Sequence, residues 1–209
     1  MQRRGRETRA EPGRAASKRG NMIREGHGME RYRIRDDWPV YFVTFSVVEW
    51  LPVFVSEATC RIVTNSLTFC HRNKGLRINA WVIMPTHLHA IVAAADGRGQ
   101  QLARTITDFR KFTGRQLSDY CDRNMPACFG ATFREAAGDD RQRQFWQSSR
   151  HPVTIETERF WRQKFDYLHE NPCRKGLVRR AADWRFSSAA YYLSDGEVAS
   201  EVPLTWLEW

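Results

Sequence analysis

The chain lacks any long apolar run. Its 209 residues contain no stretch that approaches the ~18 consecutive apolar residues of a membrane-spanning helix. The basic N-terminal segment has no apolar core of the kind that marks a secretory signal, and no segment repeats. Hydrophobic residues make up 42% of the chain and aromatic residues 12%, so a buried core can form. We therefore expect one domain with tails and no membrane span.

Cysteines are few, and their spacing excludes the common cysteine-based sites. The five cysteines stand at positions 60, 70, 121, 128 and 173. They form no Cys-x-x-Cys pair and no zinc-finger pattern, and their number is odd. We expect reduced thiols in a cytoplasmic protein.

Acidic residues are outnumbered by basic ones. The chain has 33 Lys and Arg against 24 Asp and Glu, which gives a net charge of +9 and an isoelectric point near 9.7. This balance favours a polyanionic partner, most commonly nucleic acid. A generically basic protein without such a partner would have the same composition.

The composition divides the chain into three segments. Residues 1–28 are rich in Arg and nearly devoid of apolar side chains, so they cannot bury enough surface to offset the entropy lost on ordering. We expect a disordered basic tail there. A folded domain is expected over residues 29–195, and a C-terminal tail over residues 196–209.

The apolar periodicity predicts four strands and three helices. The strands are expected over residues 40–48, 76–84, 87–93 and 152–155, and the helices over 56–74, 101–121 and 157–171. Residues 122–150 are expected to form an irregular connection, and Pro172 to stop the last helix. The order β-α-β-β-α-β-α is that of a ferredoxin-like (RRM-like) α+β fold: an antiparallel sheet with helices on one face, plus an extra C-terminal helix.

The second predicted helix offers one apolar side for the core. Its inner side is expected to comprise Leu102, Ile106, Phe109, Phe112 and Leu117.

Two histidines enter the third predicted strand. Residues 84–89 read Met-Pro-Thr-His-Leu-His, and an apolar run follows. Because side chains alternate along a strand, His87 and His89 lie on one face and Leu88 on the other. Neutral imidazole is the commonest metal ligand in proteins. The pair is either half of a metal site or two polar residues on the exposed face of a strand that buries Leu88.

The last predicted helix carries two stripes of side chains. The stripe that suits the core comprises Trp161, Phe165 and Leu168. A neighbouring stripe comprises Phe160, Lys164, Tyr167 and Asn171. Residues four apart on a helix are neighbours, so a phenol, an amide and an ammonium lie in one row. This row is either a functional site or the margin of the core.

Two separated motifs give the chain a specific resemblance. They are residues 79–89, Asn-Ala-Trp-Val-Ile-Met-Pro-Thr-His-Leu-His, and residues 165–178, which begin Phe-Asp-Tyr-Leu-His-Glu-Asn-Pro. Further matching segments are residues 40–46, 145–147 and 183–188. In this order the segments resemble the HUH-type single-tyrosine transposases, in particular the IS200-like group and the REP-associated tyrosine transposases. The resemblance covers about residues 30–195.

The resemblance implies roles for four residues. His87, His89 and Asn171 would ligate a divalent metal, and Tyr167 would be the nucleophile. A mixed nitrogen and oxygen site with open positions suits Mg²⁺ or Mn²⁺ better than structural Zn²⁺. Thr86 and Cys173 depart from the residues most usual in the family. Thr86 precedes the ligand strand, and we expect it to lie outside the chemistry.

The resemblance also implies an activity, which is metal-dependent nicking and joining of single-stranded DNA through a 5′-phosphotyrosine. The substrate would be a hairpin of the REP kind or a hairpin with single-stranded flanks. Candidate phosphate contacts are Arg110, Lys111, Arg115, Lys164, Arg174, Lys175, Arg179 and Arg180. A solvated basic face is the competing interpretation of these residues. We expect a monomer, with a homodimer as the alternative, in the cytoplasm in association with the nucleoid.

Other functions stay open at this point. A domesticated protein could recognise hairpin DNA without cutting it. An RNA-binding module could share the ferredoxin-like plan, although the candidate strands lack the RNP1 aromatic pattern. Tyr120, with Asn124 four residues later, is a minor alternative nucleophile because we expect the helix to end before Asn124.

Overall fold

The computed structural model describes residues 40–139, 141–148 and 152–207. Its strands are β1 (Val40–Ser46), β2 (Leu76–Met84), β3 (His87–Ala94) and β4 (Val153–Thr154). Its α-helices are α2 (Glu57–Asn73), α3 (Gly99–Asn124), α4 (Ala127–Glu135), α5 (Glu158–Arg174) and α6 (Ala189–Leu193), with 3₁₀ turns η1 (Val48–Trp50) and η2 (Ala181–Asp183). The strands form one antiparallel sheet in the order β2-β3-β1-β4, which is the split βαβ arrangement of the predicted fold.

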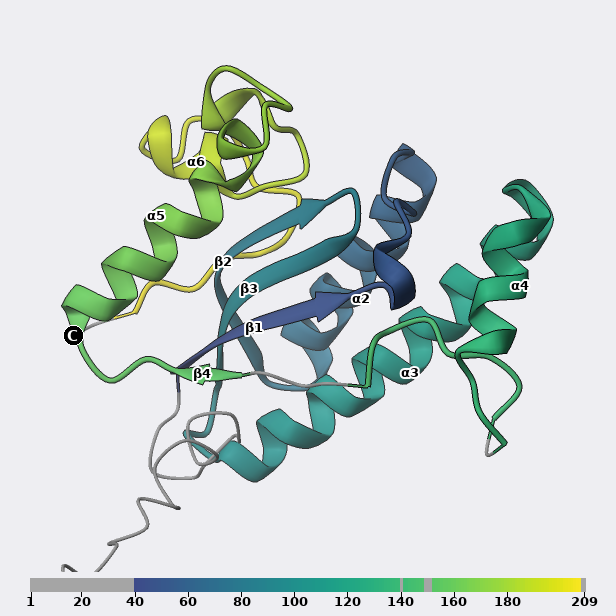
Figure 1. Ribbon diagram of the computed structural model, residues 1–209. Coiled ribbons are helices and arrows are strands. Elements are labelled where there is room, and N and C mark those ends of the chain that lie inside the picture. The colour runs from purple at the N-terminus through teal and green to yellow at the C-terminus, as the bar shows by residue number, and fades with distance from the viewer. Residues whose placement is uncertain (1–39, 140, 149–151, 208–209) are drawn as a thin grey trace, which may run out of the picture.

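The sheet has two covered faces (Figure 1). Tyr41, Val43 and Phe45 point from β1 into the main core, where α2 and α3 pack. Phe42 points the opposite way, into a smaller core that includes Leu168 of α5. The predicted helices α2 and α3 therefore share one face of the sheet, and the extra helix α5, which carries Tyr167, covers the other face. Strand alternation sends every second side chain of β1 and β3 toward α5.

The segment after α5 runs along the outer edge of β2. The Ile83 N–H donates to the Phe186 carbonyl at 2.8 Å, and the Ser188 N–H donates to the Trp81 carbonyl at 2.9 Å. Residues 196–207, which we expected to form a tail, also pack on the domain. Val202 is fully buried in the main core, and the Thr205 N–H donates to the Ile78 carbonyl at 2.8 Å.

The helical face predicted for α3 is wrong at one position. Phe112 is 58% exposed, whereas Thr113 is fully buried. At 100° per residue, position 113 lies closer than position 112 to the direction of Phe109. The Thr113 hydroxyl donates to the Phe109 carbonyl at 2.7 Å, so this polar side chain is satisfied inside the core.

Two predicted boundaries are also wrong. The connection predicted over residues 122–150 contains α4, and α3 itself extends to Asn124. Pro172 lies inside α5 rather than beyond its end. A proline lacks its own N–H, but the last turn continues because the Lys175 N–H donates to the Asn171 carbonyl at 3.0 Å.

The tail predicted over residues 1–28 lies outside the described residues. Within the described part of the chain, no helix combines the length and apolar character needed to cross a membrane.

Candidate active site

His87 and His89 share the face of β3 that α5 covers. Leu88, between them, is fully buried in the main core on the other face. The two imidazole rings are 4.6 Å apart between centroids. His89 is only 5% exposed, and its ring lies 5.1 Å from that of Phe42. The alternation predicted from the sequence therefore places both rings side by side, and the interpretation of two solvated histidines does not fit His89.

Each histidine has a threonine hydroxyl at Nδ1. Thr44 stands opposite His89 in the β1–β3 register, and its Oγ1 lies 2.8 Å from His89 Nδ1. Thr86 Oγ1 lies 2.9 Å from Nδ1 of the adjacent His87. A hydroxyl can accept the Nδ1 proton, which leaves Nε2 with its lone pair. Thr86 precedes the ligand strand as predicted, and it contacts a candidate ligand.

Burial keeps both histidines neutral. Desolvation, with a smaller contribution from the Lys175 charge, lowers the pKa of His87 to about 4. Desolvation, then His87 and Lys164, lowers the pKa of His89 to about 3. Neutral imidazoles are the form that binds a metal, so the pair is in its ligand state at neutral pH.

Tyr167 lies over the histidines from α5. Thr157 caps this helix, since its hydroxyl accepts the Phe160 N–H at 3.2 Å. The Tyr167 ring is 5.6 Å from that of His89 and 6.1 Å from that of Phe42, and the residue is 37% exposed. A phenol in this position is accessible to a substrate yet adjacent to the His89 imidazole.

The two histidines alone do not complete a metal site, and a third ligand would have to be the side-chain amide of Asn171. In the described ranges, no three His, Cys, Asp or Glu side chains come together as a metal site. Asn171 is buried, one turn beyond Tyr167 on the same helix. His89 Nε2 is buried without a hydrogen-bond partner among the described residues. An orphaned imidazole nitrogen beside a second imidazole is the arrangement that a metal would satisfy.

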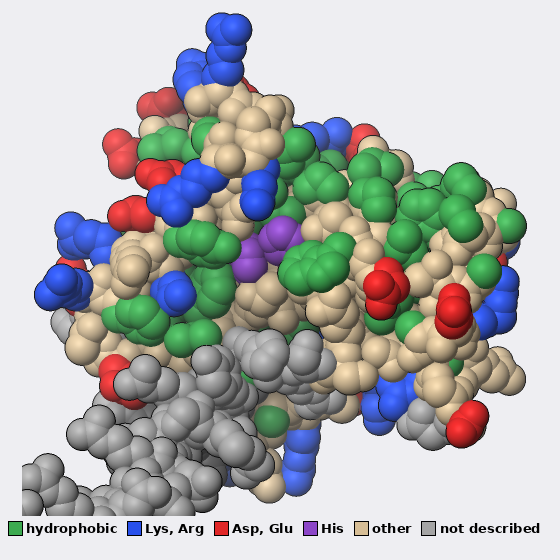
Figure 2. All heavy atoms as spheres, in the orientation of Figure 1, with side chains coloured by type: hydrophobic (Ala, Val, Ile, Leu, Met, Phe, Trp, Pro, Cys, Tyr) green, Lys and Arg blue, Asp and Glu red, His purple; other side chains and the backbone are tan. Residues whose placement is uncertain are grey.

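Basic side chains from α5 surround the phenol. Lys164 Nζ lies 5.9 Å from the Tyr167 ring centroid and 5.2 Å from that of Phe160, which confirms the predicted helical row for these three residues. Arg174 Cζ lies 5.7 Å from the Tyr167 ring while its guanidinium pairs with Glu170 at 2.6 Å. Figure 2 shows exposed histidine with hydrophobic side chains to its left and right and with Lys and Arg side chains above it and to the left.

The predicted basic residues do not form one cluster. Lys175 acts on His87 through its charge, whereas Arg179 and Arg180 are exposed beyond the helix, with Arg180 paired to Asp183 at 2.7 Å. The α3 residues instead line a separate groove of about 690 Å³ against residues 141–148. Its basic side chains are Arg110, Lys111, Arg115, Arg141 and Arg143.

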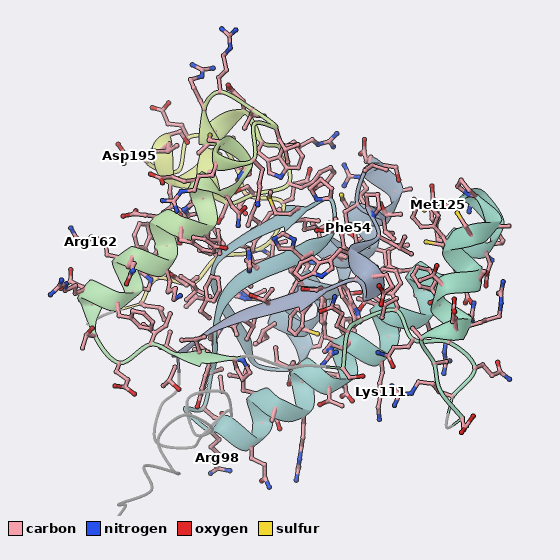
Figure 3. All side chains as sticks on the ribbon, viewed as in Figure 1. Phe54, Arg98, Lys111, Met125, Arg162 and Asp195 are labelled. Carbon is pink, nitrogen blue, oxygen red and sulfur yellow. The ribbon has the colours of Figure 1, made fainter. Side chains whose placement is uncertain are left out.

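The segment that forms one wall of the groove also pairs with β1. Arg143 pairs with Asp119 at 2.6 Å and with Asp122 at 2.7 Å, which holds the groove wall on α3. The Gln147 N–H donates to the Ser46 carbonyl at 2.9 Å, and Ser46 pairs with His87 in the sheet. Lys111 lies on α3 beside this groove (Figure 3).

Tyr120 does not share this site. It lies on α3, which packs on the opposite face of the sheet from the histidine pair. Asn124 belongs to the same helix, contrary to the expected helix end, and its side chain donates to the Tyr120 carbonyl at 2.9 Å. Thr44 and Trp50 were not predicted from the sequence as neighbours of the histidines, because the position of Thr44 depends on strand register and that of Trp50 on a turn.

Fold and site together define an α+β protein of the ferredoxin-like plan, with a histidine pair on the sheet and a tyrosine on a covering helix. No protein-family model matches the chain. The chain is similar to the REP-associated tyrosine transposase of Escherichia coli (strain K12), with 26% identity over 117 residues, which are 56% of each protein. The match thus spans about half the length of that relative.

The fold has a counterpart among solved structures. The structure of a REP-associated tyrosine transposase bound to a REP hairpin matches with a TM-score of 0.54 and 20% identity, over 85% of this chain and 89% of the other. This likeness confirms the fold class. The resemblance to REP-associated tyrosine transposases that the two motifs indicate is confirmed by the sequence match.

Proposed function

We propose that this protein is a DNA strand-transfer enzyme that nicks and joins hairpin DNA through Tyr167. The observation that carries the proposal is the accessible Tyr167 ring, 5.6 Å from His89, whose Nε2 is buried and unpartnered. The relatives, one of them bound to a REP hairpin, support the same substrate class.

The metal site would consist of His87, His89 and Asn171. When bound, Mg²⁺ or Mn²⁺ would polarise the oxygens of the scissile phosphate. Thr44 and Thr86 fix the imidazole rings at Nδ1, so that Nε2 of each ring is the available ligand atom.

The reaction at Tyr167 would exchange one phosphodiester for another. The phenol oxygen attacks phosphorus and loses its proton, the bond to the 3′ oxygen breaks, and that oxygen takes up a proton. The products are a 5′-phosphotyrosine and a 3′-hydroxyl, and attack by another 3′-hydroxyl joins strands. Lys164, half-buried beside the ring, would hold a phosphate oxygen through its ammonium group.

DNA binding would use both basic regions. Lys164 and Arg174 lie beside the phenol, Lys175 acts on His87 through its charge, and the groove on α3 would take a neighbouring stretch of backbone. The Ser46–Gln147 backbone contact joins the segment behind this groove to β1, the strand that pairs with His87. A monomer contains all the residues named here, so we propose that one copy suffices.

The test is formation of a covalent adduct. The protein is incubated with a labelled hairpin that carries single-stranded flanks, with Mn²⁺, and the products are separated on a denaturing gel. We expect an adduct that Tyr167→Phe abolishes, because the attacking oxygen is absent. Tyr120→Phe, a second tyrosine on the other face of the sheet, serves as the matched control and keeps the adduct.

Three results would contradict the proposal or part of it. An undiminished adduct in Tyr167→Phe refutes the assignment of Tyr167 as the nucleophile. Full cleavage in EDTA refutes the requirement for a divalent metal. Tight hairpin binding without any adduct favours the alternative function, a domesticated hairpin-binding protein.

A further inference from the structure

An exposed tryptophan stands beside the candidate active site with no role in the chemistry proposed above. Trp50 is 55% exposed, and its ring lies 5.9 Å from that of His87 in an edge-on arrangement. Its neighbours Val48 and Val53 are buried. The chain therefore anchors both sides of this short turn in the core and leaves the indole at the surface.

The backbone of the turn is strained. Glu49 and Trp50 have φ angles of 51° and 52°, in the left-handed region that residues with a Cβ rarely adopt. Two such residues in succession persist only when the surrounding structure forces them, and such strain clusters at binding and catalytic sites.

Hydrogen bonds on both sides impose this conformation. The Val47 N–H donates to the Thr86 carbonyl and the Phe54 N–H to the Pro85 carbonyl, each at 2.9 Å. Thr86 and Pro85 are the two residues between β2 and β3, directly before His87. Phe54, labelled in Figure 3, is buried and stacks on Trp146 at 5.8 Å. The indole is thus held in fixed relation to the histidine pair.

The chemistry of the surroundings favours an aromatic, uncharged ligand at Trp50. The adjacent Glu49 side chain is exposed and would repel a phosphate. The cations that can attract phosphates are instead Lys164 on α5 and Lys175, the residue that directly follows α5. A DNA strand carries its phosphates on one side and its bases on the other. Bases stack on aromatic side chains irrespective of sequence, because every base has a π-face.

We propose that Trp50 is a stacking platform for one nucleobase of the single-stranded segment next to the phosphate that Tyr167 attacks. The proposal rests on the proposed function and specifies how that substrate is held. A platform fixed before binding loses little conformational entropy on stacking. Trp50 would thus set which nucleotide of the flank lies beside the histidines.

The experiment measures hairpin binding without turnover. In the Tyr167→Phe background, the affinity for a hairpin with a single-stranded flank is measured by fluorescence anisotropy, without divalent metal. One abasic site is then moved through the flank position by position. Trp50→Ala should weaken binding of the intact flank by about 5- to 150-fold, the loss of one stacked base. Trp50→Phe should retain most of the affinity, and Trp206→Ala, another exposed tryptophan, should leave the affinity unchanged.

The abasic series distinguishes stacking from a structural effect. The proposal is supported if loss of the base at one flank position weakens binding by the Tyr167→Phe protein. At that same position, loss of the base should leave the affinity of the Tyr167→Phe, Trp50→Ala protein unchanged. The proposal is overturned if Trp50→Ala binds as tightly as its parent, or if every abasic position weakens the two proteins equally. Failure of the parent itself to bind the hairpin refutes the proposed function rather than the role of Trp50.

Discussion

At the scale of single residues, the histidine pair depends on two hydroxyls. Thr44 and Thr86 reach the Nδ1 atoms of different histidines from different elements, one from β1 and one from the β2–β3 turn. Partners of this kind fix the tautomer and orientation of a ligating imidazole. The structure thus places two residues of the same type in matched positions, each at Nδ1 of one histidine.

Removing either hydroxyl should weaken metal binding. Valine has nearly the shape of threonine, so Thr44→Val or Thr86→Val deletes the hydrogen bond with little change in packing. We expect each change to lower Mn²⁺ affinity by about 10- to 100-fold, measured by electron paramagnetic resonance of free Mn²⁺. Thr→Ser at either position should restore it.

Thr154→Val provides the matched control. Thr154 belongs to the same sheet but pairs with Tyr41, which points to the opposite face. If all these variants bind Mn²⁺ as tightly as the unmodified protein does, the threonines do not support the metal site. If the unmodified protein binds no Mn²⁺, the proposal of a metal site is itself wrong.

At the scale of elements, a buried histidine of α5 forms a hydrogen bond with the segment that follows this helix. His169 is 6% exposed, its Nε2 lies 2.7 Å from Ser188 Oγ, and its ring is 4.3 Å from that of Phe165. Burial lowers the pKa of His169 from 6.5 to about 4. The unfolded chain therefore binds this proton at higher pH than the folded chain does.

Acid should therefore lower the free energy of unfolding through His169. Between pH 6.5 and 4 the unfolded state holds more protons, so the free energy of unfolding falls as the pH falls through this window. For one such histidine the loss between pH 7 and pH 5 is about 2 kcal/mol. Urea unfolding in EDTA should show a smaller loss over this range for His169→Gln than for the unmodified protein. An identical pH dependence of the two proteins would contradict the buried neutral state.

The elements also show what the sequence can and cannot predict. The β2–β3 hairpin and the row from Phe160 to Asn171 were predictable, because a period of two or 3.6 residues determines which side chains share a face. The contact between Thr44 and His89 was not, because it depends on strand register across 45 positions. The continuation of α5 past Pro172 was missed since local signals favour an end there, while packing of Leu168 in the smaller core favours the helix.

At the scale of the whole molecule, positive charge lies in two places on either side of the sheet. The α5 side chains surround Tyr167, and the groove on α3 holds the second set. The three basic residues that α3 contributes to the groove were predicted from the sequence as phosphate contacts. Arg141 and Arg143 were not, because they join the groove only through the packing of residues 141–148 on α3. If DNA occupies both regions, each phosphate contact contributes to the dependence of affinity on salt.

The salt dependence identifies what lies in the groove. Lys111 and Arg115 are exposed at its rim, and their joint change to alanine should remove two phosphate contacts. The slope of log affinity against log salt should then decrease by about 1.4 if the groove takes a single strand and by about 1.8 if it takes duplex. Arg61→Ala with Arg162→Ala, two exposed and ion-paired arginines on α2 and α5, is the charge-matched control, and Arg162 points away from the sheet (Figure 3). A slope unchanged by the groove variant, measured on the flanked hairpin in the Tyr167→Phe protein, would mean that the groove is a solvated basic surface and that α5 alone binds the backbone.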